Sequence, residues 1–221
     1  MTDLTGRTVL IAGATSHSGH VATQTLHDAG AAVVAVGHDP AKLAPLSALG
    51  ARAEACDLTD EQAVDALAER LHADDVRIDG LLHLVGGWRG GGGLAGQSDS
   101  DFRFLERSLT ALRFVSRAFD EDLQGSDAAR LAIVSSVQVD RPLAGGANYV
   151  TIKAASETWA RAVAHGFAKA ARDAERPLAA ASVIFRVTAL EGLEQTLADR
   201  FVALWDAEAA AVNGMVIDLT A

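Results

Sequence analysis

Residues 131–153 read LAIVSSVQVDRPLAGGANYVTIK, an apolar run that ends in two serines and is followed, after twelve further residues, by a tyrosine and a lysine. The apolar run at 131–134 predicts a buried parallel strand. The chain around and beyond the lysine is alanine-rich with helical spacing, so Tyr149 and Lys153, four residues apart, are expected on one face of a helix. Ser136 then lies at the carboxyl end of the strand, where open α/β sheets bind their ligands.

A tyrosine beside a lysine suits acid–base chemistry. A free phenol has a pKa of about 10, and a lysine cation at about 4 Å favours the phenolate by roughly 4 kcal/mol at an effective dielectric constant of about 20. We therefore expect Lys153 to lower the pKa of Tyr149, so that the phenol exchanges a proton with a carbonyl or alcohol oxygen. Ser136 is expected to donate a hydrogen bond to that oxygen. The alternative is an exposed helix start with a solvated lysine.

Composition narrows the class of protein. With 221 residues, 49% of them hydrophobic, the chain can bury a full core, and we expect residues 1–221 to form a single domain. The formal charge of −10 argues against nucleic acid or an anionic membrane as a partner. The sequence shows no signal peptide pattern and no membrane-length apolar run, and Cys56 is the only cysteine, which predicts a cytoplasmic protein. His17 and His20 lack further ligands nearby, so we expect no metal.

A strand, a glycine-rich turn and a helix open the chain. The apolar strand is expected at 8–12, the turn reads GATSHSG at 13–19, and the helix is expected at 20–29. This order is the context that a dinucleotide-binding motif requires, because the turn lets a pyrophosphate approach the helix amino terminus. The predicted cofactor-binding residues of this turn are Gly13, Thr15, Ser16, His17 and Gly19. The alternative is a glycine-rich turn without a ligand.

The end of the second predicted strand, at 32–36, bears on the choice of cofactor. An acidic residue here binds the ribose 2′-hydroxyl of NAD, and its absence leaves room for the 2′-phosphate of NADP. The chain has Gly37 and His38 at this place, which favours NADP(H) while leaving NAD(H) as an alternative. Asp39 comes too late to bind the ribose and is expected to cap a helix that begins near Pro40.

These motifs together resemble the short-chain dehydrogenase/reductase family over essentially the whole chain. The alternation of strands and helices predicts a Rossmann-like α/β fold, with a doubly wound, mostly parallel seven-stranded sheet and helices on both faces. The resemblance implies NAD(P)-dependent interconversion of a carbonyl and an alcohol in a small molecule. It implies that Ser136 orients the oxygen, Tyr149 transfers the proton, and Lys153 also holds the nicotinamide ribose. It further implies a homodimer or homotetramer.

The resemblance assigns further cofactor contacts. Asp57, with Leu58 after it, follows the third predicted strand at 51–55, where relatives contact the adenine amino group. The alternative role of Asp57 is to cap the helix that begins near residue 59 or 60. The fourth predicted strand begins at residue 81, and its turn carries Val85 and Gly86, which we expect to line the cofactor site.

Several positions depart from the family pattern. Relatives commonly have Asn-Asn-Ala-Gly where this chain has HLVG at 83–86, and an active-site Asn where this chain has Ser108, within a long amphipathic helix expected at 102–123. The proton relay through Lys153 is therefore expected to be impaired. After a strand expected at 179–185, Val187 and Thr188 take the place of a Pro-Gly pair and are expected to contact the nicotinamide. A final helix at 193–210 and a strand at 215–218 complete the predicted sheet.

A glycine-rich segment follows the fourth strand. Residues 86–96 include seven glycines, so they cannot form a regular element. The segment is either a mobile flap whose Trp88 and Arg89 touch substrate or a flexible connector.

The departures from the family pattern leave two alternatives to carbonyl reduction. One is an NADP(H)-binding sensor or scaffold with little redox activity, and the other is a non-redox isomerase or dehydratase.

Overall fold

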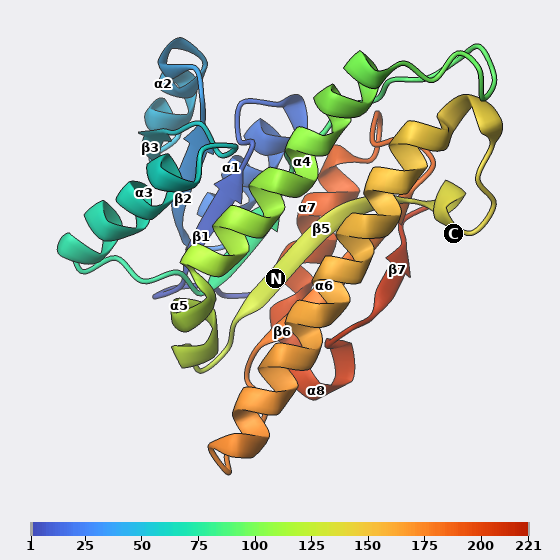
Figure 1. Ribbon diagram of the computed structural model, residues 1–221. Helices are drawn as coiled ribbons and strands as arrows, with labels where there is room; N and C mark the ends of the chain where they lie inside the picture. Colours follow the sequence, from blue (N-terminus) through green and yellow to red (C-terminus); the bar gives the residue numbers. More distant parts are fainter. Residues whose placement is uncertain (1, 221) are drawn as a thin grey trace.

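Parallel strands form one seven-stranded sheet in the order β3-β2-β1-β4-β5-β6-β7 in the computed structural model, which describes residues 2–220 (Figure 1). Every pair of neighbouring strands is parallel, which confirms the predicted fold class. The strands are β1 (Thr8–Ala12), β2 (Ala32–Gly37), β3 (Arg52–Ala55), β4 (Gly80–His83), β5 (Arg130–Ser136), β6 (Ala181–Val187) and β7 (Val216–Asp218). Met1 and Ala221, which the predicted single domain included, lie outside the described residues.

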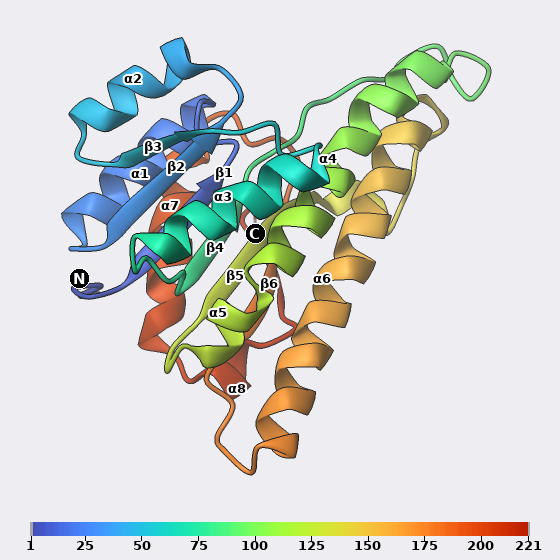
Figure 2. The same cartoon turned by 60° about the vertical axis from the view of Figure 1, so that its left-hand side comes forward.

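Helices cover both faces of the sheet, and alternate residues of each strand pack against opposite layers. On β1, Val9 and Ile11 belong to one buried cluster, whereas Leu10 and Ala12 belong to the other. The first layer contains α1 (His17–Asp28), α2 (Pro40–Ala48), α7 (Glu194–Val202) and α8 (Ala209–Val212). The second contains α3 (Glu61–Ala73), α4 (Asp99–Ala118), α5 (Asp120–Gly125) and α6 (Ala147–Asp173). In Figures 1 and 2, α4 and α6 run side by side across this second face.

Short polar side chains set the starts of three of these helices. The Ser16 hydroxyl accepts a hydrogen bond from Gly19 N at 3.1 Å, so α1 begins at His17, three residues earlier than predicted. Asp39 accepts from Ala41 N at 3.0 Å, which confirms its predicted role as the cap of α2. Asp60, not Asp57, caps α3 by accepting from two backbone amides.

Two long helices expected from the sequence are interrupted. The one predicted at 102–123 is divided into α4 and α5 at Phe119, whose fully buried ring packs in the core while its backbone leaves the helical conformation. The one predicted at 193–210 is divided into α7, a 3₁₀ turn at Ala203–Asp206, and α8. Apolar periodicity continued across both breaks, because buried residues recur at helical spacing even where the chain turns.

The strand order places one crevice at the centre of the carboxyl edge. After β1 the chain adds β2 and β3 on one side, then returns to add β4 on the other side of β1. Crossovers therefore diverge between β1 and β4, which is the position where doubly wound sheets bind ligands.

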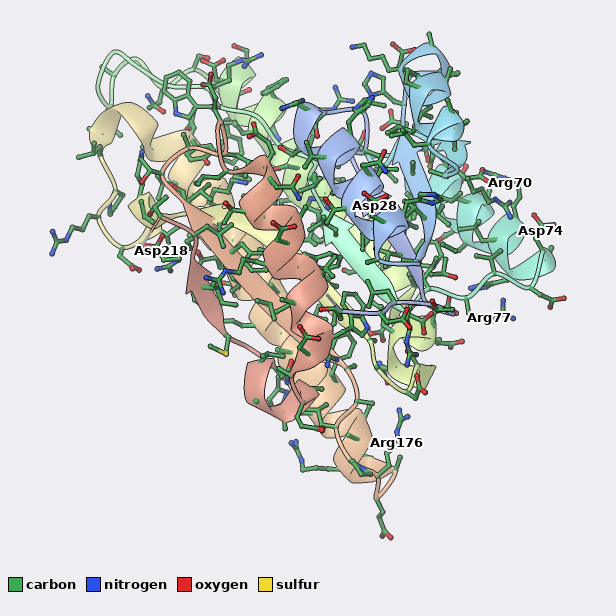
Figure 3. All side chains as sticks on the ribbon, turned by 180° about the vertical axis from the view of Figure 1, so that it is seen from behind. Asp28, Arg70, Asp74, Arg77, Arg176 and Asp218 are labelled. Atoms are coloured by element: carbon green, nitrogen blue, oxygen red, sulfur yellow. The ribbon has the colours of Figure 1, made fainter. Side chains whose placement is uncertain are left out.

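Charged side chains such as Arg70, Asp74 and Arg176 extend outward at the periphery (Figure 3). Within residues 2–220, no helix is long and apolar enough to cross a membrane.

Candidate active site

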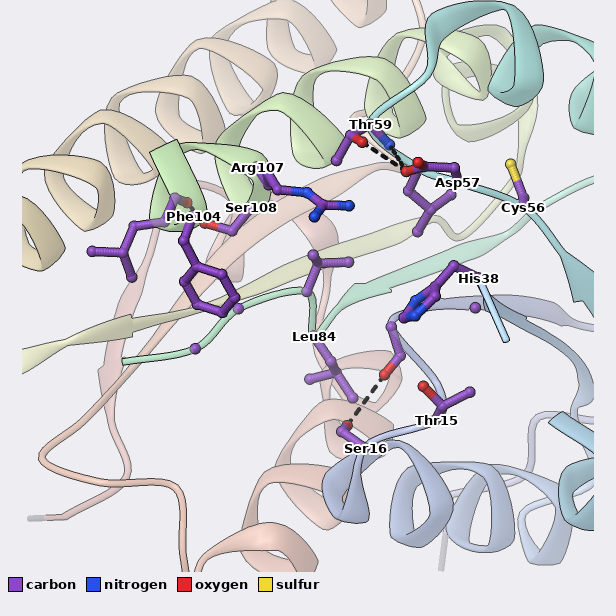
Figure 4. Close-up of a pocket in the computed structure, with 17 residues that line it drawn as sticks. Thr15, Ser16, His38, Cys56, Asp57, Thr59, Leu84, Phe104, Arg107 and Ser108 are labelled. Carbon is purple, nitrogen blue, oxygen red and sulfur yellow. Dashed lines mark hydrogen bonds between the residues drawn. The ribbon is translucent and has the colours of Figure 1, made fainter. Parts of the chain in front are cut away.

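Two adjoining cavities, of about 380 and about 390 Å³, lie over the carboxyl ends of β1 and β4. Both are lined by Ser16 and by the chain that leaves β4, so they form two compartments of one crevice. The first compartment extends towards the ends of β2 and β3 and contains Gly37, His38 and Asp57 (Figure 4). The second extends towards β5 and β6. The five residues shared by the two compartments are Ser16, Leu84, Val85, Gly86 and Gly87.

Glycines 13 and 19 are required by close packing around the first turn. Gly13 has a φ of +85°, and a Cβ there would lie 2.9 Å from Val85 N. A Cβ on Gly19 would lie 2.2 Å from Ala14 O, so the start of α1 can approach β1 only with glycine at this position. Thr15 and Ser16 line the first compartment as predicted, but His17 is exposed at the start of α1 and lines neither compartment.

The far end of the first compartment combines one carboxylate with two basic side chains. Asp57 accepts hydrogen bonds from the hydroxyl of Thr59 at 2.7 Å and from its backbone amide at 2.9 Å, and these bonds hold the pKa of Asp57 below its ordinary value. The charges of Arg107 and His38 act in the same direction. Figure 4 shows Arg107 reaching into the compartment from α4. Arg107 was not predicted as a site residue, because one exposed arginine on an amphipathic helix carries no recognisable signal in the sequence.

The second compartment is lined by Tyr149, Lys153, Val187 and Thr188, which the sequence placed at the nicotinamide end. Tyr149 and Lys153 share a face of α6, as their spacing predicted. Ser136 ends β5 with 1% exposure and lines neither compartment, and its hydroxyl acts to lower the pKa of the Tyr149 phenol. The Ser136 hydroxyl also accepts from Gln138 N at 3.2 Å.

The structure contradicts the expected lowering of the Tyr149 pKa. Burial raises this pKa, and the hydrogen bond with Ser136 opposes the rise only in part. Lys153 contributes little because its Nζ is 5.6 Å from the centroid of the Tyr149 ring and donates instead to Val134 O at 2.8 Å. Burial lowers the pKa of Lys153 itself to about 8, against the opposing influence of Glu157. The phenol is therefore protonated at neutral pH.

Glu157 extends the stripe of Tyr149 and Lys153 by one further helical turn. Its side chain is 0% exposed, and Ser135 Oγ donates to it at 2.7 Å. Arg186 donates through Nε and Nη2, both at 2.8 Å, and Arg161 donates at 2.7 Å. Burial would raise the pKa of Glu157, but these bonds hold it below its ordinary value. Glu157 was not predicted as a site residue, although its spacing of four residues from Lys153 is a signal for it in the sequence.

Both polar side-chain and backbone groups of Ser108 are engaged within the fold. The hydroxyl donates to Leu105 O at 2.7 Å, and the backbone oxygen accepts from Nε2 of His83 at 3.1 Å. Ser108 lines the first compartment rather than the second, which contains Tyr149 and Lys153. The hydroxyl proton of Ser108 is therefore already donated to Leu105 O.

The glycine-rich segment 86–96 is tied to the loop before α6. Gly91 N donates to Gly145 O at 2.7 Å, and the Gln97 side chain bonds Gly91, Gly93 and Gly145 oxygens while accepting from Asn148 N. Trp88, 59% exposed, lines the second compartment.

Arg89 does not line either compartment. Its guanidinium lies 3.9 Å from the centroid of the Phe104 ring, on α4. Of the two predicted substrate contacts in the glycine-rich segment, only Trp88 is therefore at a cavity.

The family model described as enoyl-(acyl carrier protein) reductase matches residues 13–172, which is more than half of the chain. The chain belongs to the short-chain dehydrogenase/reductase family. This assignment makes it a member of a family of oxidoreductases, as the resemblance implied. No curated protein matches the chain.

Solved structures confirm the fold of this short-chain dehydrogenase/reductase. A short-chain dehydrogenase of Escherichia coli CFT073 has a TM-score of 0.87 at 20% identity, covering 99% of this chain and 97% of that one. One from Shigella flexneri, complexed with NADP, has a TM-score of 0.85 at 19% identity, with 99% and 98% covered. An NADPH-bound short-chain oxidoreductase of Pseudomonas aeruginosa, described as having an atypical catalytic centre, has a TM-score of 0.83 at 20% identity, with 99% and 96% covered.

Proposed function

We propose that this short-chain dehydrogenase/reductase uses NADP(H) to interconvert a carbonyl and an alcohol in a small molecule. The observation that carries the proposal is the adjacency of two compartments: one with the glycine turn and basic side chains, the other with Tyr149 and Lys153. The Shigella and Pseudomonas structures, which hold NADP and NADPH, support the choice of cofactor.

The residues of the crevice fit a dinucleotide. A Cβ at Gly13, Gly19 or Gly37 would lie within 3 Å of neighbouring atoms, so glycine at these positions keeps the approach to the α1 amino terminus open. The Thr15 and Ser16 hydroxyls and the backbone amides of α1 are the donors for phosphate. Val85 and Gly86 border both compartments, and Val187 and Thr188 close the second. When bound, NADPH supplies the hydride.

The charges of the first compartment favour NADPH over NADH. Gly37 ends β2 without a carboxylate, and His38 and Arg107 line the same compartment. Asp57, with Leu58 beside it, is left for the adenine amino group. We expect fluorescence titration at matched ionic strength to give tighter binding of NADPH than of NADH. Tighter NADH binding would refute this preference.

The protonation states suit reduction of a carbonyl. Tyr149 is a neutral phenol at neutral pH, which is the form that donates a proton to a developing alkoxide. Ser136, at the end of β5, is the hydroxyl that we assign to hold the same oxygen. Lys153, with a pKa lowered to about 8, retains a proton at neutral pH and releases it more readily than an exposed lysine. It stands beside the phenol to assist its reprotonation.

The proposal is tested with a screen of carbonyl substrates that follows NADPH absorbance. Tyr149→Phe keeps the ring, so NADPH affinity should be unchanged while turnover falls by roughly 10²–10⁴, the usual contribution of a general acid. A Tyr149→Phe protein that reduces the substrate at the wild-type rate would contradict the mechanism.

Two observations favour the second candidate, an NADP(H)-binding sensor or scaffold. Ser136 lies outside both compartments, and the Ser108 proton is committed to Leu105. NADPH binding without oxidation across a broad carbonyl screen would favour this candidate over the reductase. A non-redox isomerase or dehydratase would instead change its substrate without net oxidation of NADPH.

We also propose that the protein assembles as a homodimer or homotetramer. The α4 and α6 helices lie side by side on the outer layer, and Phe114 and Trp159 on them are only partly buried. Light scattering at micromolar concentration should give a multiple of 22.9 kDa, whereas a 22.9 kDa particle would refute assembly.

A further inference from the structure

Among the buried side-chain nitrogen and oxygen atoms of residues 2–220, Nδ1 of His83 is the one without a hydrogen-bond partner. The imidazole ends β4 and lines the second compartment together with Tyr149 and Lys153. Buried polar atoms in native proteins nearly always have a partner. An unpartnered nitrogen beside a cavity that also contains a tyrosine and a lysine therefore needs a functional explanation.

The contact on the opposite side of the ring fixes the tautomer. Nε2 lies 3.1 Å from Ser108 O, and a carbonyl oxygen can only accept, so Nε2 carries the hydrogen. Burial, and then the charge of Lys153, lower the pKa of His83 to about 3, so the ring is neutral at physiological pH. In this tautomer Nδ1 presents a lone pair and can only accept.

Lys153 lines the same compartment as His83 and carries donors that this lone pair could accept from. Its ammonium group has three protons, of which one is donated to Val134 O at 2.8 Å. It is the charged group that acts on the imidazole. Of the other groups on the elements around the ring, Arg107 on α4 lines the first compartment, and Glu157 on α6 is bonded to two arginines and Ser135.

We propose that His83 is a positioning residue for Lys153: Nδ1 accepts a hydrogen bond from the Lys153 ammonium group or from a water molecule that this group holds. The hydrogen bond from Nε2 to Ser108 O holds the ring, and with it the acceptor Nδ1, in place. The contact holds Lys153 charged and oriented beside Tyr149, a role that the Ser108 hydroxyl, bonded to Leu105, does not fill. The consequence for turnover rests on the proposed reductase function, but the contact itself does not.

Two substitutions separate the two ring nitrogens. His83→Asn keeps a polar oxygen near the position of Nδ1 and is too short to reach Ser108 O. His83→Gln carries an amide to the position of Nε2, where it can bond Ser108 O, and leaves no acceptor at the position of Nδ1. If His83 only braced α4 against β4, the Gln variant would resemble wild type and the Asn variant would not. The proposal predicts the reverse.

The lysine titration provides a readout that needs neither cofactor nor substrate. The chain has three lysines, so a protein labelled with ¹³C at lysine Cε should give three resolved NMR signals, with Lys42 and Lys169 as internal references. We expect the Lys153 midpoint near pH 8 in wild type, unchanged in His83→Asn, and about one pH unit lower in His83→Gln. This is the shift expected for one lost hydrogen bond to a charged group. A shift in the Asn variant alone, or in neither, would overturn the proposal.

Imidazole ¹⁵N spectra test the contact without changing His83. The wild-type ring should be protonated at Nε2 between pH 5 and 9, and Lys153→Met should move the Nδ1 resonance. A ring protonated at Nδ1, or an Nδ1 resonance that Lys153→Met leaves in place, would refute the proposal even if the His83 variants fail to fold.

Once a substrate is found, His83→Gln should lower kcat about tenfold and leave the KM for NADPH unchanged. His83→Asn should retain most of the wild-type kcat, and a Gln variant with wild-type kcat would contradict the inferred role. If none of the carbonyl compounds tested causes the wild-type protein to oxidise NADPH, the proposed reductase function fails. The lysine titration still decides the role of His83 in that case.

Discussion

Replacing Glu157 by glutamine, which changes a single heavy atom, should destabilise the fold. The carboxylate is wholly buried and accepts four hydrogen bonds, one each from Ser135 and Arg161 and two from the Nε and Nη2 atoms of Arg186. A glutamine can still accept at Oε1, but its amide hydrogens would face the Nη2 groups of Arg186 and Arg161. The substitution therefore leaves a poorly exposed arginine charge without its buried partner.

The size of the effect follows from the exposure of the partners. Removing one member of a buried ion pair costs about 3–5 kcal/mol. Arg186 is 13% exposed, so most of this cost applies, although its contact with Asp140, 68% exposed, relieves part of it. Arg161 is 47% exposed and can turn into water, so its share is below about 1 kcal/mol. We expect Glu157→Gln to lose about 3 kcal/mol.

Thermal unfolding measures this loss. At about 2–4 °C per kcal/mol for a chain of this size, Tm should fall by roughly 6–12 °C at pH 7. Arg161→Gln is the matched control, because it removes the exposed partner of the same carboxylate and should lower Tm by less than about 3 °C. Equal effects of the two substitutions, or a Glu157→Gln protein with wild-type Tm, would show that the buried carboxylate does not hold Arg186 as described.

The pH dependence provides a second check on Glu157. Its pKa is held below the ordinary value, so its stabilising contribution is present above the unfolded-state pKa and is lost as pH falls through the folded-state value. The acid limb of the stability profile should therefore be shallower in Glu157→Gln than in wild type. The same substitution removes an influence that raises the pKa of Lys153, so the Lys153 pKa should fall from about 8 to a lower value.

Three further predictions concern other parts of the fold. Gly19→Ala places a Cβ 2.2 Å from Ala14 O and should weaken NADPH binding at least tenfold in a fluorescence titration. Gly166→Ala, a control with open space around it in α6, should raise stability by about 0.5–1 kcal/mol. Normal NADPH binding by the Gly19→Ala protein would contradict the packing argument. The buried Arg130 side chain donates to four backbone oxygens. Arg130→Met should therefore lower the free energy of unfolding by about 2–4 kcal/mol in urea. An unchanged urea midpoint would show that these bonds contribute nothing to stability. The pKa of Lys153 is lowered from 10.5 to about 8, so between these pH values the unfolded chain binds more protons than the folded chain. The free energy of unfolding should therefore rise by roughly 2–3 kcal/mol from about pH 8 to pH 10.5. Lys153→Met should abolish this rise.

Local sequence determined the elements of the fold and their order. Apolar runs separated by amphipathic helices are sufficient to predict a doubly wound parallel sheet, because each segment buries its faces according to its own period. Asp39 and Pro40 mark the start of α2 through contacts that span only a few residues. Gly13 and Gly19 could be assigned to a tight turn because few other residues fit such a turn. The pair Tyr149 and Lys153 shared a face through helix geometry alone.

Tertiary structure decided the electrostatics and partners of the site. The sign of the Tyr149 pKa shift depends on burial by neighbouring elements and on where the flexible Lys153 side chain finds an acceptor, neither of which spacing specifies. The bond between His83 and Ser108 joins residues 25 apart, and the ion pair of Glu157 with Arg186 joins residues 29 apart. Such contacts depend on how helices are seated on the sheet. Sequence periodicity shows which face of an element is buried, but the partner is set by packing of the whole chain.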